Sequence, residues 1–198
     1  MHGSIMRGDT IYLKLLGVAE LTEDYLDWAD SVAITSFIRT EITLHPRKLL
    51  SSRLDEIQEN QSLFFSVFDE ATNECIGNAH IDNIDGIHRY AVFKKIIVHP
   101  DHIHKGRECL VLLLRYGFHF IGLNRMWTTL RIDDEAELND QAGIGIQREG
   151  ISRQAAFCNG RFIDGVVMAM IHEDFDRLHG SSDEWPETGG LARPLEIE

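Results

Sequence analysis

The sequence has few cysteines, few basic residues and no long apolar run. Its three cysteines, Cys75, Cys109 and Cys158, form an odd and scattered set without a paired C-x-x-C spacing. Such a set argues against a disulfide framework or a thiolate zinc site, and it suits a reducing compartment. The apolar runs are short or interrupted by charge, and the first nine residues lack an apolar core, so we expect neither a membrane span nor a signal peptide. We therefore expect a cytoplasmic protein.

Basic residues are outnumbered, because 19 lysines and arginines stand against 32 aspartates and glutamates, giving a formal net charge of −13. This charge repels nucleic acid and anionic lipid over most of the surface, so we expect neither as a partner. A length of 198 residues with 43% apolar content suffices for one domain with a full core and is too small for two. We expect a single domain over residues 1–178, followed by an acidic tail over residues 179–198.

A strand, a polar loop and a long helix are expected to follow one another from Ile96 to Gly122. The loop contains Lys105 and Gly106, directly before the helix. The first N–H groups of a helix have no intrahelical partner, and the helix dipole adds partial positive charge there. A helix start of this kind binds anions, and phosphate is the ligand that suits it best.

The remaining elements are predicted from apolar spacing and from turn residues. We expect strands over residues 11–16, 63–68, 75–84, 89–98 and 125–132, helices that begin at Thr22 and near Pro46, and a final hairpin over residues 151–171. The pair Asn159-Gly160 in that hairpin is the strongest short-range hairpin signal in the chain. Residues 133–150 are ambiguous between a weak helix and a glycine-rich loop.

This order of elements, together with four segments, resembles the GCN5-related N-acetyltransferase (GNAT) superfamily. The segments are LTEDYLDWAD, IGNAHIDNID with HRYAV, KGRECLVLLLRYGFHFIGLNRMW and FCNGRFIDGVVMAMI. The resemblance covers roughly residues 11–175 and points to the ribosomal-protein-alanine or amino-sugar acetyltransferase-like branch. It implies an α/β fold with a mixed, largely antiparallel central sheet flanked by helices, and an N-acetyltransferase that takes acetyl-CoA as its cosubstrate.

The resemblance also implies where acetyl-CoA binds. In the family, the loop and helix start hold the pyrophosphate, and the preceding strand is splayed from its neighbour so that its backbone pairs with the pantetheine arm. The residues at matching positions are Ile96, Ile97 and Val98 on the strand, His104, Lys105, Gly106 and Arg107 at the loop, and Asn139 on the following helix. Two departures are visible: the loop is about two residues short, and GIGIQREG replaces the family's helix end with its tyrosine and Leu-Gly-Phe turn. No tyrosine follows Tyr116.

In the family the acceptor amine attacks the thioester directly, so the protein supplies positioning, oxyanion donors and a proton acceptor. By placement, Asp82, Asp85 and His88 are the candidate proton acceptors. The two aspartates could instead end a strand and form a turn, and the histidine could cover a sheet edge. The histidines of the HPDHIH segment lie in a loop without a companion carboxylate arrangement, so we expect them to be solvated, and we expect no metal site in the chain. We expect Cys109 to be a packed core residue.

The acceptor could be a protein N-terminus, an amino sugar or a small amine, and the acidic surface favours a cationic one. An alternative is a catalytically weakened module that kept the fold and binds CoA or a protein partner without turnover. The final hairpin has the edge-strand character through which a homodimer could form.

Overall fold

The computed structural model of the chain describes residues 5–15, 62–94, 96–158 and 160–180. The helices expected to begin at Thr22 and near Pro46 lie outside these residues, as does most of the expected acidic tail. None of the described helices is long and apolar enough to cross a membrane.

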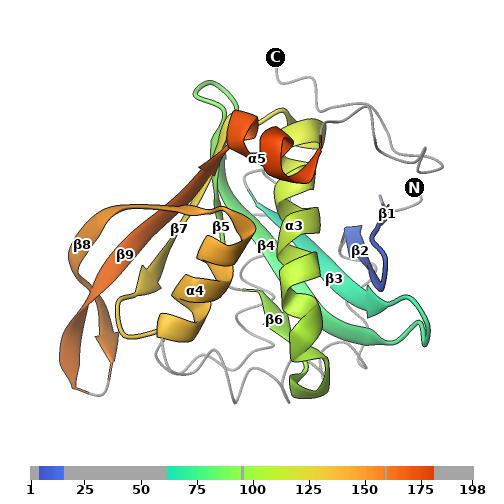
Figure 1. The fold of residues 1–198 in the computed structure, drawn as a ribbon, viewed down its shortest axis with the longest axis horizontal. Coiled ribbons are helices and arrows are strands. Elements are labelled where there is room, and N and C mark those ends of the chain that lie inside the picture. Colours follow the sequence, from blue (N-terminus) through green and yellow to red (C-terminus); the bar gives the residue numbers. More distant parts are fainter. Residues whose placement is uncertain (1–4, 16–61, 95, 159, 181–198) are drawn as a thin grey trace.

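The described strands form one mixed sheet (Figure 1). They are β1 (Ile5–Arg7), β2 (Ile11–Leu15), β3 (Leu63–Asp69), β4 (Cys75–Asp85), β5 (Tyr90–Phe93), β6 (Ile97–Val98), β7 (Arg125–Arg131), β8 (Gln147–Cys158) and β9 (Arg161–Ile171). Their order across the sheet is β1-β2-β3-β4-β5-β7-β9-β8, and β6 lies beside β4. All paired strands are antiparallel except β5 and β7, which are parallel. The prediction of a mixed, largely antiparallel sheet is confirmed.

Helices lie over one face of this sheet (Figure 1). They are the 3-10 helix η2 (Pro100–Lys105), the α-helix α3 (Gly106–Arg115), the π-helix η3 (Tyr116–Ile121), α4 (Glu135–Ile144) and α5 (His172–His179). The first three are continuous and make one long helical rod. Its first part, η2, occupies positions where the sequence predicts a polar loop, whereas the helix after it extends to Gly122 as predicted. That glycine ends the rod with a φ of 80°, a left-handed conformation that glycine adopts without steric cost.

Helix α3 packs on the sheet through its apolar face. Cys109, Leu113 and Leu114 are fully buried in the same core as the strand residues Phe65 and Ile81. Burial of each large apolar side chain contributes about 1.5–3 kcal/mol to stability. Burial also raises the pKa of the Cys109 thiol, which keeps the thiol protonated and unreactive. The prediction of a packed cysteine is confirmed.

Both predicted hairpins are present in the sheet. Strands β3 and β4 pair antiparallel around a turn at residues 70–74, and β8 pairs antiparallel with β9. At the turn of the second hairpin, Gly160 has a φ of 76°, which few other residue types accept. Turn chemistry and alternation were therefore sufficient to find both hairpins from the sequence.

The single strand expected over residues 89–98 is wrong, because the chain forms two strands there. Pairing with β4 joins Phe93 to Ile81 and Ile97 to Asn78. Phe93 and Ile97 are four positions apart, whereas their partners Ile81 and Asn78 are three positions apart. The β5–β6 segment therefore contains one extra residue, which forms a bulge. A bulge interrupts the ladder and re-aims the strand, which is why β6 separates from β5.

The ambiguous segment after β7 contains a real helix, α4. The Asp134 side chain caps its start by accepting the Glu137 N–H at 3.4 Å. The helix ends at Gly145, whose φ is 102°, and the next residue, Ile146, is buried. A glycine followed by a buried apolar residue therefore closes α4, where the family resemblance implied a Gly-Phe turn.

Helix α5 was not expected from the sequence. Its only buried residue is Phe175, so the apolar spacing that identifies a helix is nearly absent. His179, where the tail was expected to begin, is the last residue of α5, and its Nε2 lies 2.8 Å from the Ile144 carbonyl oxygen.

Candidate functional site

The parallel pair of β5 and β7 is short, and the two strands separate beyond it (Figure 1). The pairing ends at Val92 and Trp127. From there β7 continues to Arg131 paired with β9, while β6 remains beside β4. Within the described residues, the facing edges of β6 and β7 therefore have no strand partner. We call this place the β6/β7 split.

The backbone of β6 directs hydrogen-bonding groups into the split. The His99 N–H donates to the Ile76 carbonyl at 2.7 Å, which turns His99 toward β4. Because alternate residues of an antiparallel strand face the partner, the N–H and C=O of Val98 point away from β4 and toward the split. Ile96 has the same parity as Val98, and it is half-buried. Ile97 has the opposite parity and pairs with Asn78.

The start of α3 is less bare than the sequence suggests. The Gly106 N–H donates to the Ile103 carbonyl of η2, so this donor is already occupied. Gly106 itself has ordinary helical torsions, with φ −59° and ψ −37°. A Cβ atom built at this position would meet no atom within 4 Å. The backbone does not require glycine here, and its absent side chain leaves open space beside the helix start.

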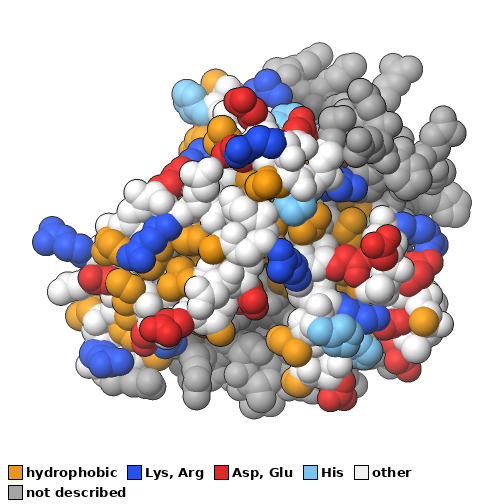
Figure 2. Space-filling view, viewed as in Figure 1, with side chains coloured by type: hydrophobic (Ala, Val, Ile, Leu, Met, Phe, Trp, Pro, Cys, Tyr) orange, Lys and Arg blue, Asp and Glu red, His pale blue; other side chains and the backbone are white. Residues whose placement is uncertain are grey.

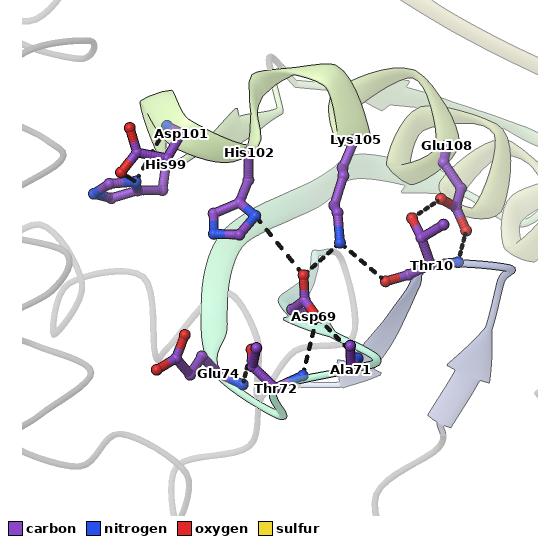
Figure 3. A network of polar contacts seen from close by, with 10 residues as sticks. All are labelled: Thr10, Asp69, Ala71, Thr72, Glu74, His99, Asp101, His102, Lys105 and Glu108. Carbon is purple, nitrogen blue, oxygen red and sulfur yellow. Dashed lines mark hydrogen bonds and ion pairs between the residues drawn. The ribbon is translucent and has the colours of Figure 1, made fainter.

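Lys105 does not extend into that space. Its ammonium group pairs with Asp69 and lies 3.3 Å from the Thr10 carbonyl oxygen (Figure 3). The Lys105 side chain is only 12% exposed. The hydrogen bond from Lys105 lowers the pKa of Asp69 to about 2, and the N–H groups of residues 71 and 72 lower it further against the effect of burial. The expected phosphate ligand is therefore part of an internal ion pair.

Two further contacts hold the helix start in place. The Glu108 carboxylate accepts the Thr10 N–H at 2.9 Å and the Thr10 hydroxyl at 2.5 Å. The Nδ1 atom of His102 lies 3.7 Å from the Asp69 carboxylate. In Figure 2, acidic, basic and histidine side chains gather over the β3–β4 turn and the start of α3. This polar network fixes the helix start relative to the start of β2 and the end of β3. No pattern in the sequence identified Asp69 as its centre.

The other three residues assigned to cofactor binding are exposed on the same side of the sheet. His104 lies in η2 and Arg107 in the first turn of α3. The Arg107 guanidinium donates to the Gly143 carbonyl, which connects the start of α3 with the end of α4. Asn139 is exposed in the middle of α4.

Asp82 lies in a polar cluster on the opposite face of β4 from the core residue Ile81. Its carboxylate accepts the Ser62 hydroxyl at 2.6 Å, and the Lys94 ammonium lies 3.4 Å away. Burial alone raises the pKa of Asp82, but the Ser62 hydrogen bond and the nearby His80 and Lys94 outweigh burial and hold it below its usual value. The carboxylate is therefore ionised at neutral pH.

Ser62 and His80 were not singled out from the sequence. His80 alternates with Asp82 along β4 and stacks on Phe64, with 3.7 Å between ring centroids. The period-2 spacing of His80 and Asp82 was the available signal, because it places both on one face of a strand. Ser62 gave no local signal, since it reaches Asp82 only through the pairing of β3 with β4.

Asp85, the last residue of β4, and His88 lie elsewhere, at the β4–β5 turn. One Asp85 oxygen accepts the N–H groups of Ile87 at 2.9 Å and His88 at 2.7 Å. The bond from the His88 N–H lowers the pKa of Asp85, and the Ile87 N–H adds to this against the effect of burial. In the same turn, Arg89 donates to the Gly122 carbonyl at 2.6 Å, at the end of the helical rod remote from Gly106. Asp85 and His88 therefore stabilise the β4–β5 turn, and the structure does not place them at the β6/β7 split.

Comparison with known sequences finds N-acetyltransferases. No family model matches the chain. The uncharacterized N-acetyltransferase YoaA of Bacillus subtilis is 28% identical over 116 residues, which are 58% of this chain and 65% of YoaA. The probable N-acetyltransferase YjcK of the same organism is 21% identical over 181 residues, covering 86% of this chain and 98% of YjcK.

Comparison with solved structures finds the same fold. The spermidine N-acetyltransferase of Vibrio cholerae, in complex with CoA and spermine, aligns with a TM-score of 0.73 and 24% identity. The alignment covers 85% of this chain and 99% of that enzyme. A chimera of this Vibrio cholerae enzyme with hSSAT gives a TM-score of 0.74 at 20% identity.

These findings fix the fold and support the activity. The fold is GNAT-like, with a mixed sheet flanked by helices, as predicted. The sequence relatives support an acetyl-CoA-dependent N-acetyltransferase, and the structural neighbours support the fold. The narrower ribosomal-protein-alanine or amino-sugar branch is not confirmed, because the structures named above are spermidine acetyltransferases.

Proposed function

We propose that this chain transfers the acetyl group of acetyl-CoA to a primary amine of a small, cationic acceptor of the polyamine class. The observation that carries this proposal is the β6/β7 split, where Val98 turns an N–H and a C=O toward an edge with no strand partner. An extended ligand with amide groups, such as the pantetheine arm, pairs with such an edge as an additional strand does. The polyamine class is supported by the spermidine acetyltransferases of the same fold and by the acidic composition.

The pyrophosphate end of acetyl-CoA belongs beside Gly106 in this proposal. The open space at this glycine admits a phosphate close to the backbone, and His104 and Arg107 are the exposed side chains that supply hydrogen-bond donors there. Lys105 does not contact the phosphate in this proposal, and it supports the site by anchoring the helix start to Asp69. Asn139 remains a proposed cofactor contact from α4, on the far side of the split.

Asp82 is the residue that we propose for the acceptor amine. Its ionised carboxylate attracts a cationic amine. We also assign to it the uptake of the ammonium proton, through a water molecule, because of its place beside the split. The N–H of Val98 is placed to stabilise the negative charge that develops on the thioester oxygen. The departing thiolate is protonated by solvent, since no tyrosine follows Tyr116 in the sequence.

A titration with CoA and acetyl-CoA tests the cofactor site. We expect binding in the micromolar range by calorimetry, and Gly106→Glu should weaken it by at least about 100-fold, because the new carboxylate fills the open space and repels phosphate. Gly106 has room for a side chain and ordinary torsions, so the variant should fold. Gly150→Glu is the matched control, since a Cβ there also meets nothing within 4 Å and Gly150 lies in β8.

Two results would contradict the proposal. One is an absence of binding at millimolar CoA, and the other is equal binding by Gly106→Glu and wild type. Binding of CoA without thiol release from acetyl-CoA and polyamines would instead favour the weakened module. The missing tyrosine and the occupied Lys105 are the observations that favour that second function.

Some expectations concern the whole chain and stay predictions. These are the single domain over residues 1–178, the tail over residues 179–198 and a cytoplasmic location. A protein N-terminus and an amino sugar are the alternative acceptors to a polyamine. The predicted homodimer would use the β8–β9 hairpin. Phe157 and Phe162 lie there with exposed fractions of 58% and 63%, and their ring centroids are 5.0 Å apart.

A further inference from the structure

Three potential metal ligands converge at the end of the helical rod remote from Gly106. The Nε2 atom of His119 lies 2.6 Å from one oxygen of Asp176, and the Nε2 atom of His172 lies 3.5 Å from the other. One ligand atom from each residue falls within 4.8 Å of the other two. At a helical rise of about 1.5 Å per residue, His119 lies roughly 20 Å from Gly106, well away from the proposed phosphate site.

Secondary structure places each of these ligands. His172 and Asp176 are four residues apart on α5, which puts them on the same helix face. His119 belongs to η3, where the rod widens from α-helix to π-helix. Such widened turns re-aim side chains and are frequent at functional sites. Figure 1 shows α5 beside this end of the rod.

The three side chains differ in exposure in a way that suits a metal ligand set. The His119 side chain is only 8% exposed, and those of His172 and Asp176 are 32% and 36% exposed. The site therefore has a closed inner side and an outer side open to water. The rings of Phe118 and His172 stack with 5.5 Å between centroids, and His119 packs edge-on to Phe175 at 5.6 Å, so both imidazoles are held in orientation.

We propose that His119, His172 and Asp176 bind a divalent transition metal of the zinc class. Two imidazoles and one carboxylate are ligands that zinc takes at about 2.0–2.2 Å, and water completes a tetrahedral set. Ligand atoms of such a set are about 3.4 Å apart, so the present positions need only small side-chain rotations. Magnesium and calcium are hard cations that prefer oxygen ligands only, so a site with two imidazole nitrogens suits them less well than it suits zinc.

The metal would act as a clasp between α5 and the helical rod. Without it, α5 is already held by the hydrogen bond from Arg115 to the His179 carbonyl at 2.7 Å. In the described structure, the Nδ1 atom of His119 is buried and has no hydrogen-bond partner. A ligand histidine that lacks this outer hydrogen bond binds its metal about 10- to 100-fold more weakly. We therefore expect micromolar affinity and a structural role. The sequence predicted no metal site in the chain, and the histidines that it singled out were those of HPDHIH, which lie outside this site.

Calorimetry and cobalt spectroscopy test the site directly. The full chain, stripped of metal with a chelator, should bind one equivalent of Zn²⁺, and Co²⁺ should give the intense visible absorption of tetrahedral coordination. At 100 times the dissociation constant, Zn²⁺ should raise the melting temperature by about 5–10 °C. Asp176→Asn and His172→Gln should each remove the binding, the visible bands and the thermal shift.

Two control variants locate the ligands. His88→Gln removes an exposed histidine of the β4–β5 turn, and His102→Gln tests the competing histidine cluster of η2. Both should keep one equivalent of Zn²⁺. The proposal is overturned if wild type binds no Zn²⁺ at 1 mM, if the α5 variants bind as wild type does, or if His102→Gln loses the metal.

Folding of the variants is checked by circular dichroism. If Asp176→Asn does not fold, His172→Gln decides, because its side chain is partly exposed and its loss disturbs less packing. None of these readouts depends on acetyl transfer, so the metal site and the proposed activity fail or stand separately.

Discussion

At the scale of single residues, Asp82 and Asp85 lie on the same strand but differ in their contacts, and the contacts determine which role each can have. Asp82 accepts a hydroxyl from Ser62 and faces Lys94 across the strand pair. One carboxylate oxygen of Asp85 accepts hydrogen bonds from two N–H groups of its own turn. The sequence could not rank them, because the partners of Asp82 come from residues 20 positions before it and 12 positions after it.

We predict that Asp82→Asn lowers kcat for polyamine acetylation by about 10²- to 10⁴-fold, since the neutral amide cannot take up a proton. The affinity for CoA should not change, because Asp82 lies on β4 and away from Gly106. Thiol release under saturating acetyl-CoA measures the first quantity and calorimetry the second. An unchanged kcat would remove Asp82 from the mechanism.

The comparison variant is Asp85→Asn. An asparagine oxygen accepts the same turn N–H groups, so this variant should fold and keep its kcat. A large loss of kcat in Asp85→Asn with little loss in Asp82→Asn would reverse the assignment and return the catalytic role to the turn.

At the scale of elements, the join between η2 and α3 depends on the buried pair of Lys105 and Asp69. The pKa of Asp69 lies at about 2 in the folded protein, below the ordinary 3.8. A depressed pKa means that the ionised carboxylate stabilises the fold at pH values above the ordinary pKa. That contribution is lost as the pH falls from about 4 through 2.

We therefore predict that wild type loses more stability to urea between pH 4 and pH 2 than Asp69→Asn does. At pH 6 the variant should be the less stable of the two, because it leaves the Lys105 ammonium buried without its charge partner. Asp101→Asn is the control from the same segment, since the Asp101 side chain is 84% exposed and should change neither value. Parallel urea midpoints for wild type and Asp69→Asn across this pH range would contradict the prediction.

Elements with strong local signals were found from the sequence, and those defined by distant contacts were not. The hairpins and the long rod followed from alternation, helical spacing, Asn159-Gly160 and Gly122. The bulge between β5 and β6 depends on how β4 pairs, and α5 depends on the packing of one residue, Phe175.

The site divides in the same way. Val98 lies on a strand beside the split, as the family resemblance implied, whereas Gly106 is the first residue of α3 and not part of a loop before it. Their roles in cofactor binding stay predictions. The partner of Lys105 could not be predicted, since Asp69 lies 36 residues earlier and approaches only through the sheet.

At the scale of the whole molecule, the net charge of −13 opposes the binding of CoA and favours the binding of the proposed polyamine acceptor. CoA is anionic and must rely on local donors at the start of α3, whereas a polyamine is drawn by the long-range field. Long-range attraction is screened by salt, because the Debye length falls from about 30 Å at 0.01 M to about 8 Å at 0.15 M ionic strength.

We predict that kcat/KM for spermidine falls by about tenfold or more over this range of ionic strength, while a monoamine of similar length loses far less. The difference follows because attraction in a common field grows with the charge of the acceptor. Acetyl-CoA is kept saturating at each salt concentration, so the salt dependence of acetyl-CoA binding does not affect kcat/KM for the amine. Equal losses for the two amines would show that short-range contacts alone select the acceptor, and the polyamine class would then lose its electrostatic support.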